Sequence, residues 1–518
     1  MTITSFSFLL LVAVGLLVYY ILPKSWQWVE LLAISLFFYY FAATPYTILY
    51  LVVSTMTAYC STMIIARIRG GERSDSRSVV IITLLAIGIN VAIWFVVKGY
   101  DFWTIGLRLL FRFFNNSTLD ALLNVRFVAA LGMGYYTLQV VAYIIDCYWQ
   151  TIEPQKNPLK LFLFVSFFPQ LITGPISRYA QLEVLYQKHS YQDLNITHGA
   201  QRVLWGFFKK LVLAERVGII VTGITSQLST YTGFYTWIAI LLYPLQLYAD
   251  FSGCMDIVLG VAEMFGIQMA ENFRNPFFSR TVQEFWQRWH ITLGVWAKDY
   301  LLYPLLKTKC FAKLGKVSKK KFGKRLGKFL PTMAGMFVLW MALGIWHGGA
   351  RYIVGVSLWY WMLLILGEWF SPVLQRLVKA LGIRTDNFSW HMFQSIRTYL
   401  LVSIGMVFFN MGIRGGIALI RQAVSVVTGG TANPRIFFDR SILNLGVSIL
   451  DIYIIVIAVF LLVTVAVLRE KYGYARNWMD KQGVVFRWSV WLILFFIVLV
   501  FGKYDSGHEA SKFIYQGF

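Results

Sequence analysis

Residues Ile452–Leu468 read IYIIVIAVFLLVTVAVL, a run of seventeen residues without a charged side chain. A helix of about 20 mainly apolar residues crosses the hydrocarbon layer of a membrane, so this run predicts a membrane-spanning helix. Similar runs recur along the chain, for example at Phe6–Ile21, Val79–Val97, Ile219–Leu247 and Tyr352–Leu366. We expect roughly 11–14 membrane helices, of which several are short enough to be re-entrant.

The composition also indicates a membrane protein. Hydrophobic residues make up 58% of the chain and charged residues only 14%, against roughly 25% charged in soluble domains. The first apolar run lacks a small-residue cleavage site and is followed by further runs, so it is interpreted as a first helix and not a signal peptide. The sequence therefore predicts an all-α polytopic membrane protein in which residues 1–518 form one integral-membrane domain.

The chain carries a formal net charge of +23. Its strongest basic stretch is Lys307–Lys328, KTKCFAKLGKVSKKKFGKRLGK, with ten Lys or Arg residues and no acidic residue. Smaller basic stretches lie at Arg67–Arg77, Arg202–Arg216, Arg376–Arg397 and Arg469–Arg487. Basic residues in short loops between spans mark the cytoplasmic side, so we expect no nucleic-acid partner. We therefore place all five basic stretches on the cytoplasmic side. If the piece Phe162–Thr173 enters the membrane and returns to the same side, both termini lie outside.

No cofactor or metal motif is recognisable. The four cysteines are scattered and show no Cys-x-x-Cys spacing, so neither a disulfide framework nor a zinc site is expected. Phosphate-binding and dinucleotide-binding glycine patterns are also missing from the sequence.

A first polar stretch inside the apolar sequence is NFRNPFFSRTVQEFWQRWHITLGVWAKDYLLYPL, residues Asn272–Leu305. Thr281 and Glu284 form a capping-box pattern that predicts a helix beginning at Val282. Apolar residues fall on one face of this helix: Val282, Phe285, Trp286, Trp289 and Leu293. Such a short amphipathic helix lies on or dips into a membrane. His290 lies at the point where this amphipathic segment gives way to an apolar one. The alternative is an interfacial aromatic belt with a His that reaches for the surface.

A second stretch, GMFVLWMALGIWHGGARYIVG, covers Gly335–Gly355. It predicts an apolar helix from Met333 that ends at His347, because Gly348 and Gly349 accept the left-handed geometry that terminates helices. Ionisable residues at membrane depth are rare and usually functional, and a histidine can accept a proton at neutral pH. The alternative is a histidine that is hydrogen-bonded as part of the packing.

Two further stretches place polar groups in apolar surroundings. In FFPQLITGPISRY, residues Phe167–Tyr179, Gln170 and two helix breakers interrupt an apolar run, as in re-entrant segments. In YADFSGCMD, residues Tyr248–Asp256, two carboxylates, Asp250 and Asp256, are expected at the end of a long span. Either carboxylate could orient a histidine, line a water-filled cavity or cap a helix.

Together these stretches resemble the membrane-bound O-acyltransferase (MBOAT) family over nearly the whole chain. The matching motifs are FFPQLITGPISRY, YADFSGCMDIVLGVAEMFG, NFRNPFFSRTVQEFWQRWHITLGVWAKDYLLYPL and LGIWHGG. Within the family the chain looks most like the bacterial branch that includes the membrane subunit of alginate O-acetylation. The resemblance implies a bundle of membrane helices around a central tunnel or funnel.

The resemblance also implies a set of site residues. The family's active-site histidine corresponds to His347 in WHGG, and its second polar position corresponds to His290 in RWH. We also expect supporting or substrate-binding roles for five further residues of these motifs: Gln170, Asp250, Trp286, Gln287 and Trp346.

The chain ends in KFIYQGF, which follows an apolar run and a polar spacer. Its last residues match a Phe-x-Tyr-x-x-Phe pattern of bacterial envelope acylation systems, in which the tyrosine is a transient acyl carrier. The resemblance therefore implies that the external tail 503–518 carries an acyl relay at Tyr515, held by Phe513 and Phe518. The alternative is an aromatic anchor at the membrane interface.

The function that the resemblance implies is O-acyl transfer without a bound cofactor. The acyl group, expected to be acetyl, comes from a cytosolic thioester, either acetyl-CoA or an acyl carrier protein. It crosses the bacterial cytoplasmic membrane toward an exported polysaccharide or cell-wall polymer, and an extracytoplasmic acyltransferase finishes the transfer. One alternative is D-alanyl transfer toward teichoic acid. An alternative of another class is a transporter or flippase in which His347 relays protons.

Overall fold

The computed structural model describes residues 1–70, 76–99, 127–349, 352–428 and 439–504, with Thr104 and Leu107. All regular elements in these ranges are helices, and an isolated antiparallel bridge joins Phe273 to Trp289. The predicted all-α class is therefore confirmed. Phe513, Tyr515 and Phe518, on which the relay prediction rests, lie outside the described residues.

Within these ranges eight helical segments are long and apolar enough to cross a membrane. They are Pro45–Gly70 (η1 and α3), Ser76–Lys98 (α4), Phe234–Met264 (α13), Lys309–His347 (α17), Ile353–Ala380 (η6 and α19), Phe388–Val427 (α20), Ile449–Tyr472 (α21) and Val484–Phe501 (α23). Two apolar helices are shorter, α1 (Phe6–Ile21) and α2 (Gln27–Ala42). Large apolar side chains are exposed along these helices, as a lipid environment permits, so the chain is a multi-pass membrane protein.

Contacts within the chain define two compact units, and the first is formed by Met1–Phe207 and Cys254–Ala270. Its other described elements are η1 (Pro45–Thr47), α3 (Ile48–Gly70), α7 (Met133–Trp149), α8 (Pro158–Ser166), α9 (Phe168–Leu171), α10 (Tyr179–Leu182), η2 (Glu183–Tyr186) and α11 (Asp193–Phe207). Helix α11 meets α13 at Gly199 and Gly260. A Cβ atom on either glycine would come within 2.6 Å of the other's carbonyl oxygen, so this contact requires glycine.

The predicted re-entrant piece is a broken helix in this unit. Helix α8 has nine residues and α9 has four, and the backbone leaves the helical conformation at Phe167 between them. Neither helix reaches the about 20 residues that a span needs. Whether the piece Phe162–Thr173 dips in and returns stays a prediction.

The second unit is formed by Phe208–Gly253 and Glu271–Tyr504. Its other elements are η3 (Phe208–Ala214), α12 (Glu215–Ser226), η4 (Pro276–Phe278), α14 (Val282–Arg288), α15 (Ile291–Ala297), η5 (Lys298–Leu302), α16 (Tyr303–Leu306), η6 (Ile353–Leu358), α19 (Trp359–Ala380), η8 (Ser441–Leu445) and α22 (Ala475–Met479). The segments η3, η5 and η6 are π-helical. Helix α17 packs against η6, and η6 also packs against α19 and α20.

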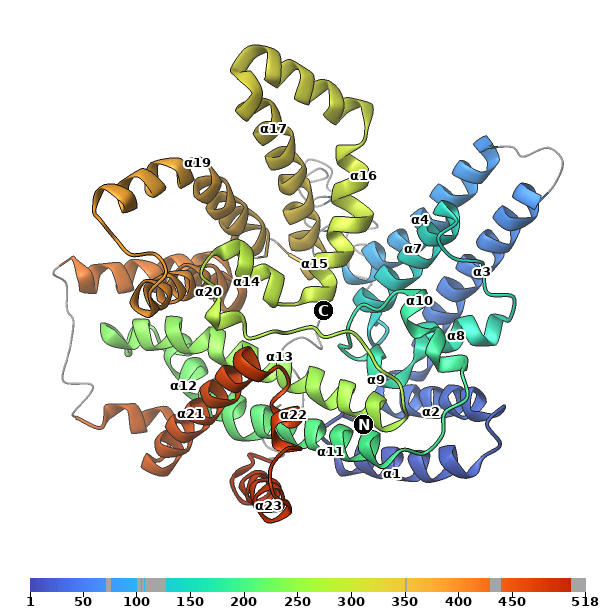
Figure 1. Ribbon diagram of the computed structural model, residues 1–518, viewed down its shortest axis with the longest axis horizontal. Helices are drawn as coiled ribbons and strands as arrows, with labels where there is room; N and C mark the ends of the chain where they lie inside the picture. The colour runs from blue at the N-terminus through green and yellow to red at the C-terminus, as the bar shows by residue number, and fades with distance from the viewer. Residues whose placement is uncertain are drawn as a thin grey trace, which may run out of the picture. The chain divides into compact units, whose positions relative to one another are not determined.

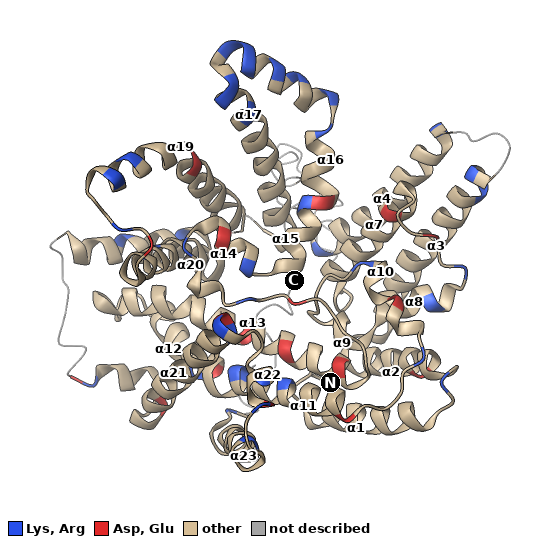
Figure 2. Cartoon of the chain, in the orientation of Figure 1, with Lys and Arg blue, Asp and Glu red and all other residues tan. Residues whose placement is uncertain are grey.

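The basic stretch Lys307–Lys328 is helical, whereas the sequence analysis expected a loop. Most of it belongs to α17, which bends at Gly323 with φ 82° and ψ 176° (Figure 1). Figure 2 shows Lys and Arg residues gathered around this bend. Glycine tolerates this positive φ, so the chain can fold back there without a loop.

The stretch Arg202–Arg216 was also expected in a loop, and that expectation is wrong. It runs from α11 through η3 into α12, and Lys209, Lys210 and Arg216 are buried. The physical reason is pairing, because buried cations are tolerated where carboxylates lie beside them. Lys210 Nζ lies 2.6 Å from both Asp250 Oδ1 and Glu215 Oε1.

Asp250 and Asp256 lie inside α13, so the expectation that they end a span is wrong, and neither caps the helix. Asp250 is bound by Lys210, within the second unit. Asp256 accepts a hydrogen bond from Arg202 Nε at 2.9 Å, within the first unit. The helix continues past both carboxylates to Met264. The two acidic residues in the sequence had suggested that the helix ends near them.

A second buried ion pair joins α12 to α21. Arg216 Nε donates to Asp451 Oδ1 at 2.9 Å, and the other carboxylate oxygen, Oδ2, accepts hydrogen bonds from Ser448 at the start of α21. Lys503 Nζ lies 3.3 Å from the same carboxylate, and its backbone N–H donates to the carbonyl of Leu211. The last described residues are therefore fixed to the π-helical segment η3.

The Lys210 ion pairs generate a first prediction. Lys210→Met leaves the carboxylates of Asp250 and Glu215 buried without this cation, and breaking a buried pair costs about 3–5 kcal/mol. We expect a clearly lower melting temperature of the purified protein in detergent. Lys316→Met, at an exposed position of α17, is the matched control and should melt like wild type. A wild-type melting temperature for Lys210→Met would contradict the stabilising role.

Candidate active site

His290 lies at a break between two short helices. Helix α14 begins at Val282 as predicted, after Thr281 accepts a hydrogen bond from the N–H of Glu284. It ends at Arg288, and Glu284 and Arg288 form the ion pair expected from their spacing, at 2.8 Å. His290 then adopts φ 47° and ψ 52°, and α15 begins at the next residue. A left-handed conformation is uncommon for a residue with a side chain and is often found at functional sites.

Neighbouring backbone holds this break in place. The N–H of Ile291 donates to the carbonyl of Asn272 at 3.0 Å, and the N–H of Arg274 donates to the carbonyl of Arg288 at 2.9 Å. The bridge between Phe273 and Trp289 belongs to the same short pairing. The segment before α14 is therefore paired with the residues that flank His290.

The side chain of Asn272 fixes the orientation of the His290 ring. Its Oδ1 atom accepts hydrogen bonds from the backbone N–H of Thr292 at 3.1 Å and from the Thr292 hydroxyl at 2.9 Å. A backbone N–H is always a donor, so the atom that faces it must be the amide oxygen. His290 Nδ1 lies 3.2 Å from the same oxygen.

This arrangement determines the tautomer of His290. Because an amide oxygen cannot donate, Nδ1 must carry the proton of the hydrogen bond. The pKa of His290 is lowered to about 3, first because burial penalises the charged ring and second because of the charge of His347. The ring is therefore neutral near pH 7, and its Nε2 atom is a hydrogen-bond acceptor.

His347 is the last residue of α17, as predicted. The helix is capped at Gly348, which has φ 83°, and Gly349 follows with φ 99°. The ring of His347 packs against Tyr352 and Phe409, with centroid distances of 5.6 and 5.7 Å. His290 is buried, whereas His347 is partly exposed. The two histidines thus differ in the exposure of the whole residue.

Trp346 contacts both histidines. Its ring centroid lies 4.8 Å from that of His347 and 6.4 Å from that of His290. The ring of Phe251, on α13, packs edge-on against the ring of His290, with a centroid distance of 5.0 Å. Two histidines that are 57 positions apart in sequence therefore meet at one aromatic cluster.

The remaining predicted residues have different surroundings. Trp286 packs edge-on against Trp340 and Tyr360, with ring centroids at 5.1 and 4.7 Å. Gln287 is exposed on α14. Gln170 is buried in the first unit, and its amide atoms have no hydrogen-bond partner in the described part of the chain.

Sequence reasoning missed the role of Asn272. This residue begins the stretch that the analysis selected, but nothing in the residue pattern connects an asparagine with a histidine 18 positions later. The available signal was a polar residue next to Phe273, four positions before Pro276. Among the described residues, no group of three or more His, Cys, Asp or Glu side chains could hold a metal ion.

A sequence model of the membrane-bound O-acyltransferase family matches residues 153–409, which include both histidines. Among curated relatives, "Probable alginate O-acetylase AlgI" of Pseudomonas syringae pv. tomato is 32% identical over 54% of this chain and 48% of its own length. The peptidoglycan O-acetyltransferase of Helicobacter pylori is 28% identical over 77% of this chain and 78% of its own length. The teichoic acid D-alanyltransferase of Bacillus subtilis is 27% identical over 47% of this chain and 60% of its own length.

The alignment thus covers about half the length of the first of these relatives. Several such relatives share the name of alginate O-acetylase, and the matched family region contains the helix break at His290 and the helix end at His347. The resemblance carried by the four motifs and the multi-pass fold agree with these matches. The chain belongs to the membrane-bound O-acyltransferase family.

Proposed function

We propose that the protein is an O-acyltransferase that moves an acyl group, most simply acetyl, from a cytosolic thioester to an exported polysaccharide or cell-wall polymer. The observation that carries this proposal is the meeting of His290 and His347 at the ring of Trp346. The names of the matched relatives, alginate O-acetylase and peptidoglycan O-acetyltransferase, support acetyl as the acyl group.

In the proposed reaction a hydroxyl attacks the carbonyl carbon of the thioester. His347 accepts the hydroxyl proton as the new C–O bond forms, and the C–S bond then breaks. The proton leaves on the departing thiol. The neutral Nε2 atom of His290 accepts a hydrogen bond from a donor group of the acceptor other than the attacking hydroxyl and so positions the acceptor. Positioning the acceptor suits this tautomer better than donating a hydrogen bond to an oxyanion, because Nε2 carries no proton.

The thioester enters from the cytosol in this proposal, and the acceptor enters from outside. A tunnel that meets at the histidines would keep water from the thioester. The basic bend of α17 is the proposed docking place for an acidic donor, either coenzyme A phosphates or an acyl carrier protein, through electrostatic attraction. The same charges would also hold this part of the chain on the cytoplasmic side.

The acyl group would leave through Tyr515 in the external tail. From Tyr504, the last described residue, to Tyr515 is 11 residues, which span about 36 Å when extended at roughly 3.3 Å each. This exceeds the hydrocarbon thickness of about 30 Å, so reaching a histidine at mid-membrane is feasible. The pKa of a phenol, about 10, is close to that of a thiol, about 8.5, so a phenyl ester is nearly as activated as a thioester. It could therefore pass the acyl group on to a second, exported transferase.

D-alanyl transfer toward teichoic acid is the second candidate, because the matched relatives include teichoic acid D-alanyltransferases. A transporter or flippase is the alternative of another class. Purified protein mixed with a labelled acetyl or D-alanyl thioester separates the three, since a transporter consumes neither donor.

Loss of the two histidines should have graded effects. We expect His347→Ala to abolish acyl transfer, because no base remains at the reacting hydroxyl, while His290→Ala slows it about 10²–10³-fold. The measurement is release of free thiol from the labelled donor by protein in vesicles. His391→Ala, on the first turn of α20, is the control and should keep the wild-type rate. Wild-type turnover by His347→Ala would refute the assignment.

Asn272→Asp tests the tautomer argument through pH. A carboxylate beside Nδ1 stabilises the charged ring and raises the pKa of His290 by about one to three units. The neutral ring is the working form and is lost as pH falls through that pKa, so the low-pH limit of the rate should move upward.

The matched control for this variant is Asn387→Asp at the N-terminus of α20, where Asp caps a helix as well as Asn does. Its pH–rate profile should match wild type. An unmoved profile in Asn272→Asp would mean that Asn272 does not set the protonation of His290.

Tyr515→Phe tests the relay. The substitution keeps the apolar ring and removes only the nucleophile, so we expect the chain no longer to become labelled by an acyl thioester, as measured by intact mass. Tyr504→Phe, at the last described position before the tail, is the control and should label normally. Normal labelling of Tyr515→Phe with unchanged polymer acylation would leave the tail as an anchor.

A further inference from the structure

Helix α20 consists of two parts that are separated by a left-handed glycine. Gly412 has φ 70° and ψ −170°, which ends the first part. Residues 388–411 alone exceed the about 20 that a span needs, so 413–427 is not required for crossing. This second part buries Gly416 and Leu419 but exposes both arginines, Arg414 and Arg421. Exposed basic and apolar residues on one short helix are typical of a helix in the membrane interface.

A groove runs between this second part of α20 and the elements η6 and α19. Its volume is about 610 Å³, within the roughly 300–1,000 Å³ of ligand sites. Nine of its ten lining residues are uncharged and largely apolar: Val354, Leu358, Trp359, Met362, Ile404, Phe408, Ile417, Ile420 and Val424. The tenth is Arg421, which forms no ion pair with any other described residue.

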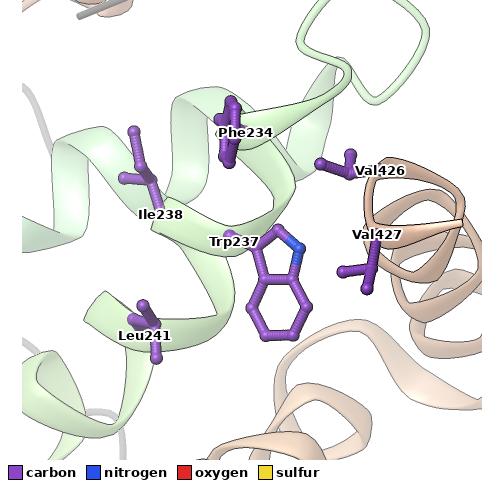
Figure 3. A pocket seen from close by; sticks show the side chains of 6 residues that line it. All are labelled: Phe234, Trp237, Ile238, Leu241, Val426 and Val427. Carbon is purple, nitrogen blue, oxygen red and sulfur yellow. The ribbon is translucent and has the colours of Figure 1, made fainter. Parts of the chain in front are cut away.

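A second groove flanks the same part of α20 and serves as an internal comparison. It measures about 540 Å³ and lies between Val426 and Val427 on one side and the start of α13 on the other (Figure 3). Trp237 of α13 lines it and donates its indole N–H to the carbonyl of Ala423 at 3.0 Å. None of its six lining residues is charged. The two grooves thus differ in the cation that only the first one carries.

We propose that the groove beside Arg421 binds an anionic phospholipid, with one acyl chain along its apolar wall and the phosphate paired with Arg421. The guanidinium binds phosphate oxygens in a bidentate manner, and the hydrocarbon lining excludes water from the chain. A polyanionic polysaccharide would use the charge but not the apolar wall, so the lining favours a lipid. This site is independent of the proposed acyl transfer.

Lipid binding can be measured by native mass spectrometry of the purified full chain, titrated with dioleoylphosphatidylglycerol or dioleoylphosphatidylcholine. We expect the anionic lipid to bind the wild type about fivefold more tightly, as for one basic side chain beside an anionic headgroup. Arg421→Gln should abolish this preference, and Arg421→Lys should retain part of it. Val424→Trp fills the groove and should weaken binding of both lipids.

Two matched variants serve as controls. Arg414→Gln removes the same charge from the same helix, at a position that does not line the groove, and Ile238→Trp fills the other groove. Both should keep the wild-type preference. The proposal is overturned if Arg421→Gln keeps the full preference. It is also overturned if glycerol 3-phosphate or a soluble polyanionic polysaccharide displaces the lipid at equal concentration, because the charge alone would then account for binding.

Discussion

A chain embedded in hydrocarbon must satisfy its buried polar groups from within, and the second unit is arranged around this constraint. Lys210 lies against Asp250 and Glu215, and Arg216 lies against Asp451, so the charges of η3 and α12 are matched by carboxylates of α12, α13 and α21. Such pairs contribute little net stability, because desolvation offsets their attraction. The pairs instead fix the relative positions of the helices that they join. A shift of one helix would separate two buried charges, and little water is there to solvate them.

The same constraint shapes the histidine cluster. A buried imidazole is stable when it is neutral and when one nitrogen has a fixed partner, and Asn272 supplies that partner for His290. The aromatic rings of Trp346, Phe251 and Phe409 surround the two histidines without competing for their protons. In the proposed reaction, proton transfer is therefore left to the imidazole of His347 and the attacking hydroxyl.

The sequence was sufficient for the class and for most helix boundaries near the site. Glycines at 348 and 349 and the Thr281 cap have local effects, so the end of α17 and the start of α14 could be predicted. Burial of Lys209 and Lys210 could not, because charge alone indicates a loop until the partner carboxylates are known. The break at His290 was also invisible, since only the tertiary pairing with residues 272–274 makes a left-handed histidine favourable.

The left-handed backbone at His290 has a consequence for how the ring meets an incoming acceptor group. Such a conformation costs a residue with a side chain about 1–2 kcal/mol, and the hydrogen bonds of Asn272 and Ile291 hold the chain in it. The orientation of the dipole is therefore established during folding, before any substrate arrives. In the proposed reaction, water in the same place would have to reorient for each acceptor, whereas this ring is already held in one orientation.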